Sequence, residues 1–139
     1  MLRTAVQHHH VGCDVAEAVD LAAVLGGEFH CVALLREAVD ANRIDLYLQP
    51  ILTLPQRKVR YYESMTRLRM ADGTLILPTD FIKHADKGGL MPKIDNLMLF
   101  RCVQVLRRLL MKNREIGLFC NIAANTLNDP EFFPQFSQF

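Results

Sequence analysis

The sequence predicts an α/β domain with a largely parallel sheet. Segments of strand length, rich in Ile, Leu, Val and Tyr, alternate along the chain with segments whose apolar residues recur at helical spacing. Helical segments also separate the second predicted strand from the third, and a strand–helix–strand order is typical of parallel pairing. The first two strands are an exception. Their link is far shorter than the dozen or so residues that a parallel crossover needs, so we expect them to be antiparallel.

The composition is that of one globular domain. The chain has 139 residues, half of them hydrophobic, and a formal charge of +1. This balance predicts no binding to DNA, RNA or anionic lipid, and no apolar run reaches membrane-spanning length. The four cysteines, at positions 13, 31, 102 and 120, have neither a CxxC pair nor metal-ligand spacing. We expect reduced thiols in a cytoplasmic domain.

Residues 1–30 differ from the rest of the chain, and we interpret them as a linker or N-terminal extension. They contain three adjacent histidines, at positions 8–10, which suggest either a metal site or a solvated lead-in segment. Neighbouring side chains rarely converge on one ion, so we favour the lead-in. The folded part is expected to be residues 31–139.

The first half of that folded part contains two predicted helices and two predicted strands. A short helix over 31–43 precedes strands over 44–52 and 59–69. The next helix is expected to have Thr79 as its N-cap and to end at Gly88–Gly89.

The second half begins with the longest periodic segment. This predicted helix covers 91–114, with Pro92 in its first turn, where a proline is tolerated. Residues 116–123 read as a short buried strand, and a last helix is expected with Asp129 as N-cap and Pro130 in its first turn. Three strands do not complete a sheet of this kind, so we expect further C-terminal sequence to belong to the fold.

One face of each of the first two strands carries polar side chains. The faces consist of Tyr61, Glu63, Met65 and Arg67 in one strand and of Asp45, Tyr47, Gln49 and Ile51 in the other. Either Glu63 and Arg67 form an internal ion pair, or the face is open to water, or the groups bind a ligand. A buried ion pair adds little stability, so the residues alone leave these alternatives open.

Several separated motifs occur in a characteristic order. They are Gln-Pro-Ile, Glu-x-x-x-Arg, Pro-x-x-Phe-Ile, Gly-Leu-x-x-x-Ile-Asp and Asn-Ile, found in "LYLQPIL", "YYESMTRLR", "LPTDFIKHADKGGLMPKID" and "GLFCNIA". From about Leu35 to the C-terminus, the chain resembles the opening of the EAL family. These are bacterial phosphodiesterases and receptors for cyclic di-guanylate (cyclic di-GMP), a second messenger. The tripeptide that names the family is altered here to Glu63-Ser64-Met65.

This resemblance implies a TIM-type (β/α) barrel whose first strand is antiparallel to the rest. Such a barrel needs about 250 residues, so only its first half is expected here. By motif position, Glu63 and Asn121 would be ligands of Mg²⁺ or Mn²⁺. Arg67 would clamp a phosphate, Gln49 would contact the nucleotide through its amide, and Met65 would replace the family's leucine against a guanine.

The resemblance also implies metal-dependent hydrolysis of cyclic di-GMP to the linear dinucleotide. The family's later motifs, including its paired aspartates and the lysine that assists water, have no counterpart in these residues. We therefore predict that this chain alone is inactive, whether it is a fragment or part of a longer protein. The alternatives are a non-catalytic receptor and a protein-interaction scaffold with a degenerate motif. Expected partners are cyclic di-GMP, a second copy and other signalling domains.

Two further residues carry expectations of their own. His84 falls on a polar helix face and is expected to be solvated. Asp95 is either a charge near the start of its helix or a structural group on the ligand side.

Overall fold

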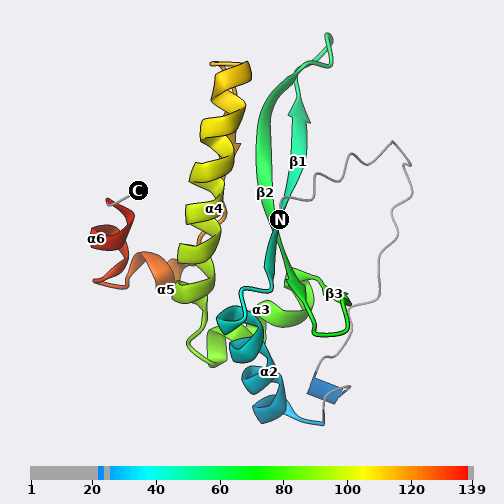
Figure 1. The fold of residues 1–139 in the computed structure, drawn as a ribbon, viewed down its shortest axis with the longest axis vertical. Coiled ribbons are helices and arrows are strands. Elements are labelled where there is room, and N and C mark those ends of the chain that lie inside the picture. The colour runs from blue at the N-terminus through cyan, green and yellow to red at the C-terminus, as the bar shows by residue number, and fades with distance from the viewer. Residues whose placement is uncertain (1–21, 24–25, 138–139) are drawn as a thin grey trace.

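The computed structural model describes residues 22–23 and 26–137, so most of the predicted linker, with its histidines and Cys13, lies outside the described residues. Figure 1 shows a long β-hairpin beside one long helix, with shorter helices at the lower end of the hairpin. In chain order the elements are α2 (Glu28–Asp40), β1 (Ile44–Leu52), β2 (Val59–Arg69), β3 (Leu75–Ile76), α3 (Pro78–Lys87), α4 (Met91–Lys112), β4 (Gly117–Phe119), α5 (Ala124–Leu127) and α6 (Phe132–Phe136).

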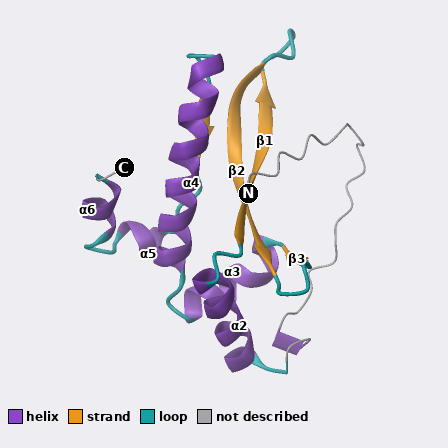
Figure 2. Cartoon of the chain, viewed as in Figure 1, coloured by secondary structure: helices purple, strands orange, loops and turns teal. Residues whose placement is uncertain are grey.

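Strand β2 is the centre of the sheet (Figure 2). It pairs with β1 in antiparallel fashion from Leu68 to Val59, with one irregularity in the register near Ile51, which confirms the prediction from the short link. On its other side, the end near Leu68 pairs with β3 and the end near Tyr61 pairs with β4. The β4 pairing is parallel, as expected for strands that are separated by helices α3 and α4.

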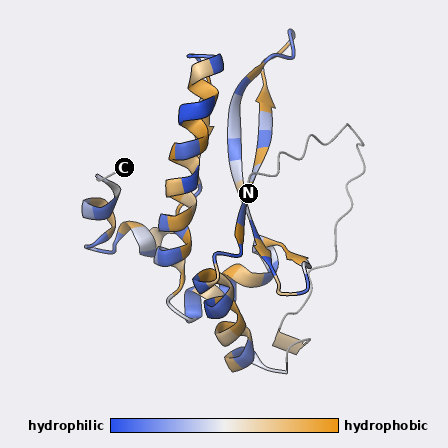
Figure 3. Cartoon of the chain, in the orientation of Figure 1, coloured by the Kyte–Doolittle hydropathy of each residue, from blue (hydrophilic) through white to orange (hydrophobic). Residues whose placement is uncertain are grey.

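The core lies on the face of the hairpin that the even-numbered residues share. Ile44 and Leu46 of β1 and Leu68 of β2 are all buried there, and Leu48 packs against the same cluster. Helices α2, α3 and α4 supply the rest of this core, and the colouring of Figure 3 shows apolar bands alternating with hydrophilic ones along α4. Each such buried Leu, Ile or Phe contributes roughly 1.5–3 kcal/mol. The core therefore takes up one face of the hairpin, and the face formed by the odd-numbered residues is not part of it.

Helix α3 begins two residues earlier than Thr79 as N-cap would require, so that prediction was wrong. Leu77 is the N-cap, without a side-chain capping bond, and Pro78 occupies the first turn. The fixed φ of proline is already suited to this position, which explains the start. The predicted end is confirmed, because Gly88 is the C-cap and Gly89 follows with a φ of 65°.

The C-terminal part differs most from the prediction. Strand β4 has three residues, all half-buried or exposed, and Phe119 is 55% exposed, so it is not a buried strand. Helix α5 was not predicted. Glu131, and not Asp129, is the N-cap of α6. The Asp129 carboxylate instead accepts a hydrogen bond from the Glu131 N–H at 2.9 Å, in the turn before the helix.

The position of α2 explains why the prediction for His84 fails. This helix begins at Glu28, before the predicted boundary at residue 31, and packs against α3. His84 of α3 is therefore only 3% exposed, and the prediction that it is solvated was wrong. Its Nδ1 lies 3.6 Å from Oε1 of Glu28. Among the described residues, no helix is long and apolar enough to cross a membrane.

Candidate functional site

The two polar faces predicted from the sequence form one continuous surface. In the β1–β2 register, Gln49 lies opposite Glu63, Tyr47 opposite Met65, and Asp45 opposite Arg67. Directly opposed residues of an antiparallel pair project to the same side of a sheet. We call this surface, formed by the odd-numbered residues 45–51 of β1 and 61–67 of β2, the polar face. It is opposite to the core.

Glu63 and Asn121 are brought together from positions 58 residues apart. Because β4 runs parallel to β2, with Phe119 beside Glu63, the residues that follow β4 pass along the same end of the sheet. The Asn121 Nδ2 donates a hydrogen bond to Oε1 of Glu63 at 2.9 Å. Asn121 is exposed and Glu63 is half-buried.

Arg67 makes no ion pair with Glu63 among the described residues, so the internal ion pair considered above is wrong. Four positions along a strand span about 13 Å, too far for a direct pair. Arg67 instead lies over the Tyr47 ring, with Cζ 5.7 Å from the centroid, and Nη1 donates to the Thr66 carbonyl at 2.8 Å. A cation–π contact of this kind holds the guanidinium across the face while its other N–H groups remain available.

Asp95 holds the segment that follows β4. It is 5% exposed, and its Oδ2 accepts hydrogen bonds from the Ala123 N–H at 2.9 Å and from the Thr126 hydroxyl at 2.5 Å. Burial raises the pKa of Asp95, and these two hydrogen bonds partly oppose that rise. Of the two roles considered for Asp95, a charge near the start of its helix and a structural group on the ligand side, these contacts favour the structural group. Thr126, which is fully buried, was missed because nothing in the local sequence links it to α4.

The described cysteines are free thiols, as expected, but two of them are in contact. The Sγ atoms of Cys102 in α4 and Cys120 after β4 are 3.7 Å apart. A hydrogen bond from the Cys102 thiol lowers the pKa of Cys120 to about 7, and the same contact together with burial raises the pKa of Cys102.

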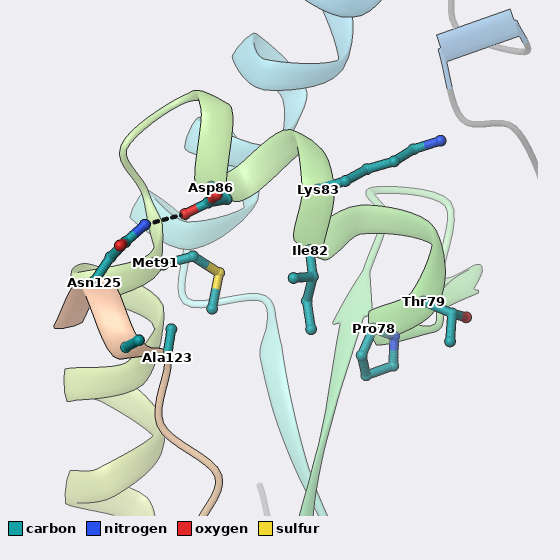
Figure 4. A pocket seen from close by; sticks show the side chains of 9 residues that line it. Pro78, Thr79, Ile82, Lys83, Asp86, Met91, Ala123 and Asn125 are labelled. Atoms are coloured by element: carbon teal, nitrogen blue, oxygen red, sulfur yellow. Dashed lines mark hydrogen bonds between the residues drawn. The ribbon is translucent and has the colours of Figure 1, made fainter. Parts of the chain in front are cut away.

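A cavity of about 560 Å³ opens beside the start of α3, near the segment that follows β4 (Figure 4). It is lined by Pro78, Thr79, Ile82, Lys83, Asp86, Met91, Ala123, Ala124 and Asn125. A hydrogen bond of 2.6 Å from Asn125 to Asp86 closes one side of it. None of the five predicted site residues lines this cavity. The sequence signal that locates it is the Pro-x-x-Phe-Ile motif, which supplies Pro78 and Ile82.

The family model of the EAL domain matches residues 33–139. This chain belongs to the EAL-domain family. The antiparallel β1–β2 pair and the parallel β2–β4 pair are part of the TIM-type barrel of that family, as the solved structure of a relative also indicates.

Relatives of this EAL domain include two curated bacterial proteins. The cyclic di-GMP phosphodiesterase NbdA of Pseudomonas aeruginosa is 32% identical over 94 residues, which are 67% of this chain and 12% of NbdA. The cyclic di-GMP phosphodiesterase PdeR of Escherichia coli is 27% identical over 104 residues, which are 75% of this chain and 16% of PdeR. The chain thus spans a small part of the curated relatives it matches.

A solved structure gives a similar comparison. The FimX EAL domain from Pseudomonas aeruginosa, crystallised with c-di-GMP, superposes with a TM-score of 0.63 at 28% identity. The match covers 78% of this chain and 43% of the FimX chain.

The EAL family is generally dependent on divalent metal, and the donor atoms at Glu63 and Asn121 fit part of such a site. Mg²⁺ and Mn²⁺ favour oxygen ligands, and Mg²⁺ requires nearly octahedral geometry. Glu63 carries a carboxylate and Asn121 an amide oxygen, and the Asn121 Nδ2 faces Glu63. No group of three or more His, Cys, Asp or Glu side chains converges in the part of the chain that the structure describes. One carboxylate and one amide oxygen are fewer ligands than an octahedral Mg²⁺ site requires.

Proposed function

We propose that this chain is the cyclic di-GMP-binding first part of an EAL domain of the phosphodiesterase class. The observation that carries the proposal is the polar face itself. Gln49, Glu63 and Arg67 lie on one side of a hairpin whose other side is core, and Asn121 is hydrogen-bonded to Glu63. The printed names of NbdA and PdeR and the nucleotide complex of FimX support this ligand class.

Each residue of the polar face has a chemical role in this proposal. The planar guanidinium of Arg67, braced on Tyr47, suits two oxygens of one phosphate. Met65 lies between Glu63 and Arg67 on the same face and presents a polarisable apolar surface to a guanine ring. The exposed amide of Gln49, opposite Glu63, is both donor and acceptor for the nucleotide.

Glu63 and Asn121 would hold Mg²⁺ or Mn²⁺ in the complete domain. When bound, such an ion polarises a phosphate oxygen and lowers the pKa of a water molecule. In this chain, Glu63 accepts a hydrogen bond from Asn121 and so orients that amide toward the polar face. Two oxygen donors support nucleotide binding by this chain, whereas hydrolysis requires further ligands.

A receptor that binds cyclic di-GMP without hydrolysing it is the second candidate, and the incomplete set of donors favours it for this chain. The middle residue of the altered tripeptide does not help to decide. Ser64 is 4% exposed and lies on the core side of β2, so replacing the family's alanine there leaves the polar face unchanged.

We also propose a cytoplasmic location, because the described cysteines are free thiols. Linkage to other signalling domains is supported by the much greater length of NbdA and PdeR.

Isothermal titration calorimetry tests the proposed binding. The chain, titrated with cyclic di-GMP in the presence of Mg²⁺, should give a saturable heat, and Arg67→Ala should weaken binding by about tenfold to a hundredfold because a charge-assisted phosphate contact is lost. Arg60→Ala is the matched control. Arg60 lies seven positions before Arg67 on the same strand, at the irregularity in the β1–β2 register, and pairs with Glu115 at 2.5 Å. Wild-type protein that gives no heat would contradict the proposal.

A hydrolysis assay separates the two candidates. We expect the purified chain with Mn²⁺ to leave cyclic di-GMP intact, as followed by anion-exchange chromatography. Appearance of the linear dinucleotide, abolished by Glu63→Gln, would show that this chain is itself an enzyme.

A further inference from the structure

Two cysteines face each other between α4 and the end of β4. Cys102 and Cys120 are 18 positions apart in the sequence, and their Sγ atoms are 3.7 Å apart. Cys102 is 3% exposed, in the core, whereas Cys120 is only half-buried. A reagent in solution therefore reaches Cys120 first, with Cys102 directly behind it.

We propose that Cys102 and Cys120 are a redox modification site that forms a reversible intramolecular disulfide. A disulfide has a sulfur–sulfur length of about 2.0 Å, so the two sulfur atoms must approach by about 1.7 Å. Rotation about the Cα–Cβ bonds of two facing cysteines moves their sulfur atoms over distances of this order. In a reducing compartment, a disulfide of this kind is transient and responds to oxidants.

The oxidant that fits this arrangement is a small hydroperoxide. The sulfur of Cys120 attacks one peroxide oxygen, the O–O bond breaks, and Cys120 becomes a sulfenic acid while the other oxygen leaves as water or an alcohol. The Cys102 sulfur then attacks the Cys120 sulfur and displaces its hydroxyl as water. Two thiols thus lose two electrons and two protons, and one peroxide is reduced. A thiol reductant reverses the modification by exchange.

The position of the pair links it to the polar face. Cys120 immediately precedes Asn121, whose side chain also lies 3.5 Å from the Ser64 carbonyl, and Asp95 of the same helix α4 holds Ala123. Drawing residue 120 toward α4 shifts the backbone on which Asn121 depends for its 2.9 Å hydrogen bond to Glu63. This second part, the effect on ligand binding, rests on the proposed function. Disulfide formation does not.

Peptide mapping tests the disulfide directly. The full chain is treated with a slight excess of hydrogen peroxide, blocked with iodoacetamide, and digested with trypsin without reduction. Cleavage at the arginines places Cys102 in peptide 102–107 and Cys120 in peptide 115–139. We expect the two peptides to be joined, with the loss of two hydrogen atoms, and to separate on addition of dithiothreitol.

Three variants serve as controls. Cys120→Ser and Cys102→Ala should each abolish the joined peptide, whereas Cys13→Ser should leave it unchanged. Carbamidomethylated Cys102 and Cys120 after peroxide treatment, or joining mainly to Cys13 or Cys31, would overturn the proposal.

Calorimetry with cyclic di-GMP then tests the link to the polar face. We expect the oxidised chain to bind about tenfold more weakly than the reduced chain, the size of one lost charge-assisted contact, and the Cys120→Ser variant to be insensitive to peroxide. Equal affinities of the two forms would overturn the link. Absence of binding by the reduced chain would instead count against the proposed function, and the peptide map would still decide the disulfide.

Discussion

Asp95 determines how the chain continues after β4. Its buried carboxylate oxygen accepts two hydrogen bonds, one from the backbone of Ala123 and one from the hydroxyl of Thr126. Both donors come from the segment that follows Asn121, a predicted ligand-side residue. The order of this segment therefore depends on one side chain of α4.

Replacing Asp95 by alanine should lower the free energy of unfolding by about 2–4 kcal/mol, because two inward-facing donors lose their acceptor. Urea denaturation followed by circular dichroism measures this change. Asp95→Asn keeps an acceptor oxygen in the same place and should cost less than about 1 kcal/mol. Equal losses for the two variants would show that the hydrogen bonds are not the cause.

The raised pKa of Asp95 gives stability a dependence on pH with a definite sign. The unfolded chain releases this proton near the ordinary aspartate value of about 3.9, whereas the folded chain holds it to higher pH. Stability should therefore fall as pH rises from that value to the raised pKa, and the fall should be absent in Asp95→Asn. Urea midpoints of the two proteins across this range test the expectation.

Asp72 provides a control of the opposite sign. Its pKa is lowered, mainly by the hydrogen bond from the Thr74 N–H at 2.9 Å. Its contribution is present above the ordinary value and is lost as pH falls through the lowered pKa. Asp72→Asn should therefore flatten the acid side of the profile. A variant that changes neither slope would contradict the assignment.

For single residues, alternation in the sequence was sufficient to place Glu63, Met65 and Arg67 on one face. It was not sufficient for His84. His84 lies one turn after Phe81 on the buried side of α3, where α2 packs against this helix, and the packing of two helices is not a local property of either sequence. The contact between Glu63 and Asn121 was expected only from the family resemblance.

The two faces of the β1–β2 hairpin differ: one packs in the core and the other is the polar face. Its even-numbered residues nearest the short helices, Ile44, Leu46 and Leu68, enter the core, and its odd-numbered residues form the polar face. We expect Leu68→Ala, at a side chain that is 1% exposed, to lower the free energy of unfolding by about 2–5 kcal/mol because a cavity remains. Thermal or urea unfolding measures this effect.

Leu54→Ala is the matched control for that substitution. Leu54 lies in the turn of the same hairpin and is 81% exposed, so its loss should change stability by no more than about 0.5 kcal/mol. Comparable effects at the two positions would show that the even-numbered side of β2 is not the core side.

Long elements with strong periodicity were predicted well, and short ones were not. Strands β1 and β2 and helix α4 could be predicted because each has nine or more residues that repeat one period. In the strands the period is two residues, and in the helix it is the helical turn. Strand β3 has two residues and α5 has four, too few to show any period. Strand β3 forms because it pairs with β2, and α5 packs against α4. Such tertiary contacts cannot be read from a local sequence pattern.

In the molecule as a whole, the sheet is open next to β4. Among the described strands, β4 pairs only with β2, and Phe119 on β4 is 55% exposed beside Tyr61, at a ring distance of 5.4 Å. An unpaired strand edge with an exposed aromatic residue promotes association of copies.

We expect the isolated chain to associate with increasing concentration, and Phe119→Lys to reduce that association, because a charge at a strand edge opposes pairing. Sedimentation velocity at several concentrations measures it. Met111→Lys is the control: Met111 is 87% exposed but lies at the end of α4, away from a strand edge. A greater effect of Met111→Lys than of Phe119→Lys would contradict this explanation.

The two-residue repeat of β2 has a practical consequence for engineering. A library that varies only positions 61, 63, 65 and 67 leaves every inward-pointing side chain of that strand untouched. Under the proposed function, selection for altered nucleotide preference can then proceed without repeated rescue of folding, since the proposed ligand contacts and the core residues are encoded at alternate codons of the same short stretch of gene.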